Sequence, residues 1–440
     1  MHEYADYIII SECIFDSVSD DPYKGFIAVK DNKILDVSKE DYHDQYRCKN
    51  TVIINSKDNT VIPGAVDVHC FFAGYAGIHY QKIHGMPDVD PSPELLKKIL
   101  NDKDFIIPFF KKHMKMLNSK GITTVKEIGF DDYYGFTDSL EKMENDNELT
   151  LRFNFMSQPV LEPININYGL SMRNRFNSDM VKFSGYNMMT DGSVSDHQAD
   201  LKQPYLDSDS TCHLNIDWTA IENAVLTADG YDFRYSLHAQ GDAAIAKCTN
   251  ILNKCKKNKN GKLKNRHSMT DLELSDPKDL EEMGKLNVVG EIYPQIQSLY
   301  SKAAKLNMIN ERLGTSRSNN YWNRRYMLDH GMILSCGTDL PLLIDDIPES
   351  IYNAVYGMFS DSDVPFNISN MMTVSELLKA WTYGGAYNLS MENIIGTLEK
   401  GKRADIVIFD GNLFDSDFRS IKHISVETTI FDGKIVYQKQ

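Results

Sequence analysis

The chain has 440 residues and a formal net charge of −15, and 42% of its residues are hydrophobic and 25% are charged. This composition is typical of a soluble globular protein with one large domain and a smaller one, or with two or three ordinary domains. The acidic balance argues against nucleic-acid binding, because phosphate groups attract basic surfaces. No run of about 18 or more apolar residues is present, so the sequence predicts no membrane-spanning helix.

The seven cysteines are scattered along the chain and include no Cys-x-x-Cys pair, which argues against a disulfide framework. Residues 1–16 carry acidic side chains ahead of a short apolar stretch and lack the basic start of a signal peptide. We therefore expect a protein of the reducing cytoplasm.

Both ends of the chain have the pattern of β-structure. Between residues 5 and 62, short segments of alternating apolar residues are separated by turn-forming residues. Residues 404–411 and 424–438 repeat this pattern. We expect the two ends, residues 1–62 and 392–440, to meet and to form one small β-sandwich domain.

The middle of the chain, residues 63–391, alternates between strand-like and helix-like segments, with the first strand beginning just before it. Eight such β-then-α units can be counted, and eight units predict a (β/α)8 TIM-like barrel. The predicted strands lie within residues 61–71, 121–130, 151–160, 181–192, 233–242, 263–271, 287–295 and 333–342.

Residues that can bind a metal or move a proton occur near the ends of four predicted strands. In a barrel of this kind, the chemistry lies at the C-terminal ends of the strands. The four residues are His69 on the first strand, His238 on the fifth, His267 on the sixth and Asp339 on the eighth. Three imidazoles and one carboxylate suit zinc, and a water bound to zinc becomes a nucleophile. Each residue alone has another interpretation, as a hydrogen-bonded core histidine or a helix-capping aspartate.

Six segments stand in order along almost the whole chain: VIPGAVDVH (61–69), KGITTVKEIG (120–129), TDGSVSDHQADLKQPYLD (190–207), LHAQGDAAI (237–245), SCGTDLPL (335–342) and ENIIGTLEKGKRADIVIFD (392–410). In sequence and order they resemble the amidohydrolase superfamily, and in particular its YtcJ-like branch. The resemblance implies a metal-dependent hydrolase with a barrel on a β-sandwich built from both chain ends. It implies that His69, His238 and His267 are metal ligands. Asp339 would be both a ligand and the base that takes a proton from the attacking water.

The first-strand motif of that superfamily is His-x-His, whereas this chain has His69-Cys70-Phe71. Residues i and i+2 of a strand share a face, so Phe71 takes the direction of the missing ligand. A phenyl ring cannot donate to a metal. Cys70 should point away from the barrel axis unless a bulge turns the strand.

The fourth strand departs from the family pattern as well. Many two-metal relatives carry a carboxylated lysine there that bridges the metals, and Asn187 stands at the corresponding position. Lys182 lies five residues earlier, with opposite parity on a regular strand. Because an uncharged amide is a poor bridge, we do not expect two metals.

The remaining residues can form a site for one divalent metal, with zinc favoured by the ligand types. His238 and His267 form a partial shell that Asp339 or His69 could complete. Glu127 and Glu291 also lie near strand ends and could supply a carboxylate, although each could equally form a salt bridge.

Three residues are candidates for substrate binding: His197, Tyr75 and Asn187. His197 lies in a segment that faces the substrate in the resembling family, and Tyr75 follows the first strand closely enough to polarise a substrate carbonyl. Each also has a structural interpretation, as a surface histidine or as a packed ring. The sequence does not decide whether residues 79–98 form a lid or whether the protein is a homodimer, as this scaffold often is.

The function that we expect is hydrolysis of an amide or related C–N bond of a small molecule by a metal-activated water. The alternative is a member of the family that has lost part of the metal site and binds no metal. In that case, the fold could serve only to bind a ligand. Asp339 and His238 could also act as an acid/base pair in an isomerase.

Overall fold

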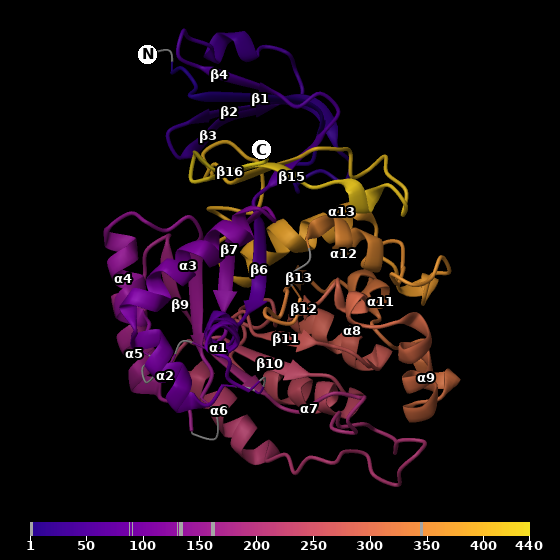
Figure 1. Cartoon of the computed structure of the whole chain (residues 1–440). Coiled ribbons are helices and arrows are strands. Elements are labelled where there is room, and N and C mark those ends of the chain that lie inside the picture. Colours follow the sequence, from indigo (N-terminus) through magenta and orange to yellow (C-terminus); the bar gives the residue numbers. More distant parts are fainter. Residues whose placement is uncertain are drawn as a thin grey trace.

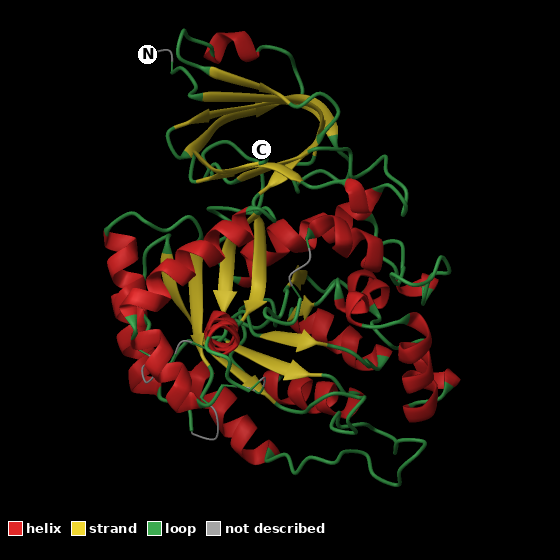
Figure 2. Ribbon diagram, viewed as in Figure 1, coloured by secondary structure: helices red, strands yellow, loops and turns green. Residues whose placement is uncertain are grey.

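The computed structural model describes residues 3–87, 89, 91–129, 131, 135–159, 163–343 and 346–440. It has two parts, a curled β-sheet and a parallel barrel wrapped by helices (Figures 1 and 2). The predicted architecture, a (β/α)8 barrel with a separate β-domain, is confirmed. None of the helices in the described ranges is long and apolar enough to cross a membrane.

The β-domain contains strands from both ends of the chain, drawn in indigo and yellow in Figure 1. Strand β14 pairs antiparallel with β5, with Ile406 opposite Pro63, and this pairing joins the two ends in one sheet. The strand order is β16-β15-β14-β5-β1-β2-β3, and β4 pairs with β1. The predicted domain boundaries at residues 62 and 392 stay a prediction. The strands are β1 (Tyr7–Ile14), β2 (Tyr23–Lys30), β3 (Lys33–Ser38), β4 (Val52–Asn55), β5 (Thr60–Pro63), β14 (Ile406–Phe409), β15 (Val426–Phe431) and β16 (Lys434–Gln438).

The barrel contains eight parallel strands in sequence order, and each lies within one of the eight predicted segments. The last strand meets the first through two backbone hydrogen bonds, from Asp339 N to His69 O and from Phe71 N to Leu340 O, both 2.8 Å long. The barrel strands are β6 (Ala65–Cys70), β7 (Ile122–Glu127), β8 (Arg152–Ser157), β9 (Val181–Met189), β10 (Tyr235–Ala239), β11 (Ser268–Asp271), β12 (Val289–Ile292) and β13 (Leu334–Cys336).

Helices surround the barrel, and several begin at a side chain that caps the free backbone N–H groups. Ser92 accepts a hydrogen bond from Leu95 N at the start of α2, and Thr373 with Glu376 forms a capping box at the start of α13. The helices are α1 (Phe72–Ile83), α2 (Pro93–Asn101), α3 (Lys103–Asn118), α4 (Thr137–Asn145), α5 (Ile166–Arg175), α6 (Trp218–Gly230), α7 (Asp242–Leu252), α8 (Pro277–Leu286), α9 (Lys302–Arg312), α10 (Thr315–Ser318), α11 (Arg324–Asp329), α12 (Ile347–Ala354), α13 (Val374–Lys379) and α14 (Gly385–Asn388). Short 3-10 segments are η1 (His43–Tyr46), η3 (Ile296–Leu299), η4 (Ile368–Asn370) and η6 (Ile421–His423), and η5 (Ala380–Gly384) is a π-helical segment.

The β-domain lies against the N-terminal ends of the barrel strands. In Figure 1 the arrows of β6 and β7 point away from it. Arg152 on β8, with 1% of its surface exposed, forms ion pairs with Asp405 and Asp432 of the β-domain. Thr429 Oγ1 donates a hydrogen bond to the Asn118 carbonyl, 2.7 Å away. The C-terminal ends of the strands, where barrel chemistry lies, therefore face away from this contact.

Candidate active site

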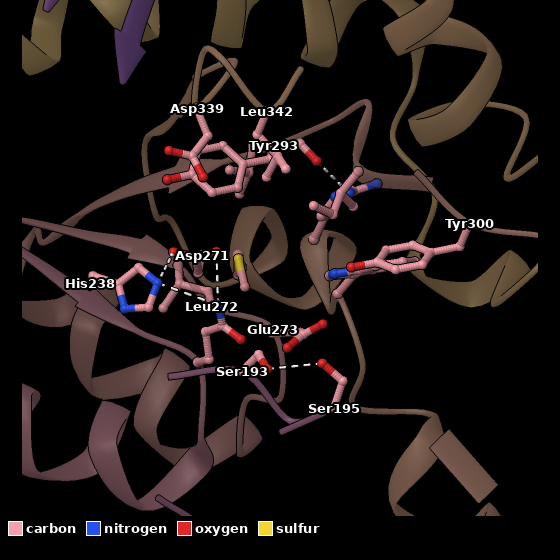
Figure 3. Close-up of a pocket in the computed structure, with 16 residues that line it drawn as sticks. Ser193, Ser195, His238, Asp271, Leu272, Glu273, Tyr293, Tyr300, Asp339 and Leu342 are labelled. Carbon is pink, nitrogen blue, oxygen red and sulfur yellow. Dashed lines mark hydrogen bonds and ion pairs between the residues drawn. The ribbon is translucent and has the colours of Figure 1, made fainter. Parts of the chain in front are cut away.

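A cavity of about 190 Å³ opens beyond the C-terminal ends of β10, β11 and β12 and the segment that follows β13 (Figure 3). Figure 3 shows His238 and Asp271 pointing toward one another, with Asp339 and Tyr293 projecting from a neighbouring part of the wall. The polar side chains that line the cavity include those of His238, Asp271, Glu273, Tyr293, Arg324 and Asp339.

His238 is held in place by the loops around the end of β10. The carboxylate of Asp191, which follows β9, accepts hydrogen bonds from the backbone N–H groups of Gln240 and Gly241, both 2.9 Å long. These bonds fix the turn directly after the strand. The imidazole Nε2 of His238 lies 2.8 Å from Oδ2 of Asp271, the last residue of β11.

Asp339 is positioned by the closure of the barrel. Its backbone has a φ of 51°, in the left-handed region that aspartate and asparagine tolerate better than most residues. Because Asp339 N donates to the His69 carbonyl, the two residues stay adjacent, and Nε2 of His69 lies 3.6 Å from Oδ1 of Asp339. Two histidine–aspartate pairs thus lie at this end of the barrel, and three of the four residues, His238, Asp271 and Asp339, line the cavity.

Burial and neighbouring charges set the protonation of these groups. Burial alone would lower the pKa of His238, but the Asp271 carboxylate outweighs it and raises that pKa to about 9. Burial raises the pKa of Asp339 to about 6, against the opposing effect of His69. Without a bound cation, these shifts keep His238 protonated and Asp339 mostly ionised near pH 7, and a cation that binds His238 would displace its proton.

His267 does not belong to this site, and the prediction that it shares a metal with His238 is wrong. It immediately precedes β11, so it lies at the N-terminal end of the strand, whereas Asp271 ends that strand at the cavity. Its Nε2 lies 3.1 Å from Oδ1 of Asp229 on α6, and its Nδ1 accepts a hydrogen bond from Tyr235 N, the start of β10. The sequence segment 263–271 is strand only over its last four residues.

Asp229, Cys255 and His267 form the one group of three potential metal-binding side chains, within the described ranges, whose donor atoms all lie within 4.8 Å of one another. Because Nδ1 of His267 accepts a backbone N–H, the ring proton resides on Nε2 and is donated to Asp229. This tautomer has no free lone pair for a cation. The Asp229 carboxylate also accepts hydrogen bonds from Lys256 N and Asn265 Nδ2, so structural hydrogen bonds account for the group.

The donor set at the cavity mouth fits a single divalent cation in its chemistry. His69, His238, Asp271 and Asp339 provide two imidazole nitrogens and two carboxylates, which are ligand types that zinc and related ions accept. In the described part of the chain they form two separate pairs, since no three of their donor atoms lie within 4.8 Å of one another.

The residues that follow His69 add no ligand. The Phe71 ring fills space beside two glycines, since a Cβ added at Gly74 or Gly129 would lie 2.5 or 3.0 Å from it. Cys70 is fully buried, and its Sγ lies 3.8 Å from Glu127 Oε2 rather than at the cavity. Phe71 stands where the family motif has its second histidine. His69 therefore remains as the potential metal ligand that β6 supplies.

Glu127 and Glu291, both considered as carboxylate ligands, have other roles. Because successive strand residues face opposite sides, Lys126 points into the barrel and Glu127 points outward. Glu127 Oε2 accepts a hydrogen bond from Phe72 N, 2.6 Å away, at the first turn of α1. Burial raises the pKa of Glu127 to about 8.

Glu291 lies inside the barrel and orients His69. It forms an ion pair with Lys126, and both side chains are fully buried. Thr270 Oγ1 and Asn388 Nδ2 donate further hydrogen bonds to its carboxylate, 2.6 and 3.0 Å long. One Glu291 oxygen lies 3.4 Å from Nδ1 of His69, which leaves Nε2 of that ring to face Asp339.

None of the three predicted substrate-binding residues lines the cavity. His197 lies 3.0 Å from an Asp207 carboxylate oxygen and stacks on the His213 ring at 4.9 Å. Tyr75 is on α1, and its ring packs 5.3 Å from that of Phe109 on α3. The prediction for His197 rested on the family segment in which it lies, and that for Tyr75 on its distance from the first strand. In both cases the local backbone turns the side chain elsewhere.

Asn187 also lies away from the cavity, although it faces the barrel interior. Its Nδ2 donates to the side-chain oxygen of Gln158, and the residue is 1% exposed. On β9 it is level with Ser236, two residues before His238 on β10. Asn187 is thus one layer deeper than the mouth of the site and cannot reach a molecule in the cavity.

Sequence reasoning missed three cavity residues. Asp271 could have been found, because it ends the strand that His267 begins. Tyr293 follows β12, and its hydroxyl is buried without a hydrogen-bond partner in the described residues. Arg324 begins α11, in a segment without any motif that would connect it to the barrel mouth.

Comparisons with known proteins agree with this architecture. The Bacillus subtilis protein YtcJ, which carries the name of an amidohydrolase, is 25% identical over 263 residues, which cover 59% of this chain and 48% of YtcJ. Protein LONG AFTER FAR-RED 3 of Arabidopsis thaliana is 24% identical over 335 residues, which cover 72% of this chain and 55% of that protein. The chain thus matches about half the length of each of these relatives.

A solved structure of an uncharacterized metal-dependent hydrolase from Pyrococcus horikoshii has the same fold. Its TM-score is 0.74 at 15% sequence identity, and the match covers 94% of this chain and 99% of that one. The model of the amidohydrolase family matches residues 94–437, more than half of the present chain. The chain belongs to the amidohydrolase family.

Proposed function

We propose that this protein hydrolyses an amide or related C–N bond of a small molecule bound in the barrel cavity. The observation that carries the proposal is the meeting of two imidazoles and two carboxylates, from β6, β10, β11 and the segment after β13, beside one cavity in a member of this family. The cavity has a volume of about 190 Å³, which suits a small substrate.

One divalent metal, held by His69, His238, Asp271 and Asp339, completes the proposed site. Such a cation lowers the pKa of a water and polarises a carbonyl. Asp339 would take the proton from the attacking water and pass it to the leaving nitrogen, because its carboxylate lines the cavity. His267 has no part in this chemistry.

Tyr293 takes the role first expected of Tyr75, which is stabilisation of the developing oxyanion. Its side chain lines the cavity, and its ring lies 5.5 Å from the His69 ring in an edge-on contact. Burial raises the pKa of its hydroxyl well above the usual range, so the hydroxyl keeps its proton and can donate it as a hydrogen bond.

A second candidate function is metal-free proton transfer, as in an isomerase. It is favoured by the pairing of His238 with Asp271 at 2.8 Å, which stabilises a protonated imidazole without any cation. In this case His238 would donate a proton and Asp339 would accept one, since both side chains line the cavity.

Metal analysis of protein purified without chelator separates the two functions. About one metal per chain, lost in His238→Leu and kept in His267→Leu, supports the hydrolase. No metal after incubation with zinc or manganese supports the metal-free alternative. Loss of the metal in His267→Leu at unchanged fold would contradict the ligand set proposed above.

A further inference from the structure

Arg324 is a buried cation in the cavity wall without a carboxylate partner. The residue is 5% exposed. Its Nη2 donates to the Tyr293 carbonyl, 3.2 Å away, and within the described residues no other hydrogen bond and no ion pair is made by its guanidinium. Because a guanidinium has five N–H donors, most of its hydrogen-bonding capacity is unused.

The other two buried arginines of the barrel each lie within ion-pair distance of a carboxylate. Arg152 forms ion pairs with Asp405 and Asp432. Arg234 lies 3.5 Å from Glu291, inside the barrel. Arg324 is therefore the exception, and it is also the one of these three that lines the cavity.

Two acidic groups of the same wall are already paired with other cations, and the third, Asp339, lies 3.6 Å from His69. Asp271 lies beside His238, and Glu273 Oε1 accepts a hydrogen bond from Lys305 Nζ, 3.0 Å away. Burial lowers the pKa of Arg324 to about 10, and the Cys336 thiol is the one group that acts to raise it. The guanidinium remains charged at neutral pH, and none of the ion pairs among the described residues joins it to a carboxylate.

A buried unpaired charge is costly, and a protein keeps it where a ligand supplies the opposite charge. We propose that Arg324 binds a carboxylate of the substrate. The substrate is then an amide that carries a free carboxylate, of the N-acyl amino acid class, with its C–N bond toward Asp339. This inference rests on the hydrolase function proposed above and names its substrate class.

The charges of the wall favour a carboxylate over a phosphate. The planar guanidinium matches a carboxylate with two parallel hydrogen bonds. One guanidinium neutralises one negative charge, whereas a phosphate dianion would bring a second charge near Asp271 and Glu273. Trp322 supports the cation, since its ring centre lies 5.7 Å from the Arg324 guanidinium carbon.

The test compares binding of carboxylates with binding of matched neutral amides. Calorimetric titration uses wild-type protein with a panel of N-acetyl amino acids, apolar, aromatic and acidic, and with the C-terminal amide of each. We expect at least one carboxylate to bind roughly 30-fold or more tightly than its amide, because removing one partner of a buried charge pair costs about 2–5 kcal/mol. Equal affinities, or no binding across the panel, would overturn the inference.

Arg324→Met should remove this preference, with the carboxylate weakened to the level of the amide, and Arg324→Lys should keep part of it. The matched control is Arg325→Met, because the neighbouring Arg325 forms ion pairs with Asp329 and Glu376 and does not line the cavity. An unchanged preference in Arg324→Met would overturn the inference.

A stability measurement shows whether Arg324 serves the fold instead. Without ligand, Arg324→Met should unfold at the same temperature as wild type or higher, because it removes an uncompensated buried charge. A lower unfolding temperature for Arg324→Met, together with an unaltered ligand preference, would assign Arg324 to the support of the Tyr293 carbonyl.

Measuring hydrolysis of the same compounds distinguishes a failure of the hydrolase function from a failure of the carboxylate site at Arg324. If carboxylates bind through Arg324 and none is hydrolysed, the hydrolase function fails and the carboxylate site stands. If carboxylates and amides are hydrolysed equally well, the hydrolase stands and the role of Arg324 fails.

Discussion

Asp271 and His238 face each other at 2.8 Å across the ends of β11 and β10, and this pair forms one side of the cavity mouth. His267, four residues before Asp271, lies at the opposite end of the same strand against Asp229. His238 and His267, which the sequence analysis assigned to one metal site, therefore lie at opposite ends of the barrel.

Replacement of each histidine by leucine should separate these roles. His238→Leu should lower kcat/KM at least about 100-fold, because it removes an acid/base or ligand group. His267→Leu should leave kcat within about twofold but lower the free energy of unfolding by about 2 kcal/mol or more, since it takes hydrogen-bond partners from Asp229 and from Tyr235 N. Steady-state kinetics and urea unfolding measure the two effects, and a loss of activity in both variants would argue against the separation.

Asp339→Asn should abolish most of the turnover without harming the fold. The amide cannot accept a proton, and general-base catalysis contributes about 10²–10⁴-fold. Asparagine tolerates the left-handed backbone of this position, so circular dichroism should match that of wild type. The measurement is kcat with the N-acyl substrate that binds best, and an undiminished kcat would remove Asp339 from the role of base.

The buried ion pair of Lys126 and Glu291 should respond asymmetrically to mutation. Lys126→Met leaves Glu291 facing Arg234 at 3.5 Å, whereas Glu291→Gln leaves two buried cations without a carboxylate. We expect Lys126→Met to cost about 3 kcal/mol of unfolding free energy and Glu291→Gln to cost more, about 5 kcal/mol. Urea unfolding of both single variants and the double variant measures the coupling, and equal costs would mean that Arg234 does not share the charge.

Glu291→Gln should also affect the site, because Glu291 lies 3.4 Å from Nδ1 of His69. The expected result is a fall in kcat of the folded Glu291→Gln protein that is larger than the fall in kcat of the folded Lys126→Met protein. A fall of equal size in both variants would indicate a general loss of structure instead of a loss of His69 orientation.

His113 should make the protein less stable in mild acid. It lies on α3 with 1% exposure, neither ring nitrogen has a hydrogen-bond partner in the described residues, and burial lowers its pKa to about 3. The unfolded chain takes up this proton near pH 6.5 and the folded chain does not, so the stability present above pH 6.5 is lost as pH falls toward 3. Between pH 7 and pH 5 this group alone should cost about 2 kcal/mol.

His113→Phe should remove that contribution, because phenylalanine suits the neighbouring rings, with Phe72 at 4.9 Å. The measured quantity is the difference in unfolding free energy between variant and wild type, which should grow by about 2 kcal/mol from pH 7 to pH 5. The exposed His84, changed to Gln, serves as the control and should show no such growth. A constant difference for His113→Phe would mean that His113 is accessible to protons in the folded state.

The fold followed from patterns that are local in the sequence. Each barrel strand lies in a predicted segment because its apolar run and flanking turn residues are adjacent along the chain. The pairing of β5 with β14 was also predictable, since strand-like segments at both ends of one chain need partners. His69, His238 and Asp339 were placed at the C-terminal end of the barrel for the same reason, as residues at or just beyond strand ends, and His238 and Asp339 line the cavity. Their roles as ligands or catalytic groups stay predictions.

Two features of the structure made the predicted site partly wrong. One is the residue at which a strand begins, and the other is the direction in which a side chain points. The segment 263–271 could begin its strand at several residues, and only pairing with β10, with Ser268 opposite Ser236, decided that His267 precedes it. Tyr75 was judged by its distance from β6, but α1 turns its ring toward Phe109. A shift of one residue along a strand or a helix moves a side chain to another face.

The sequence by itself determined the barrel, the β-domain built from both termini and the loss of a His-x-His pair at Phe71, because these are encoded in adjacent residues. Only the tertiary structure decided that Asp271 replaces His267 at the mouth and that Arg324 reaches the same cavity without a carboxylate partner. The physical reason is that hydrogen bonds and ion pairs act over a few ångströms in space, between residues such as Arg324 and Tyr293 that lie 31 positions apart in the chain.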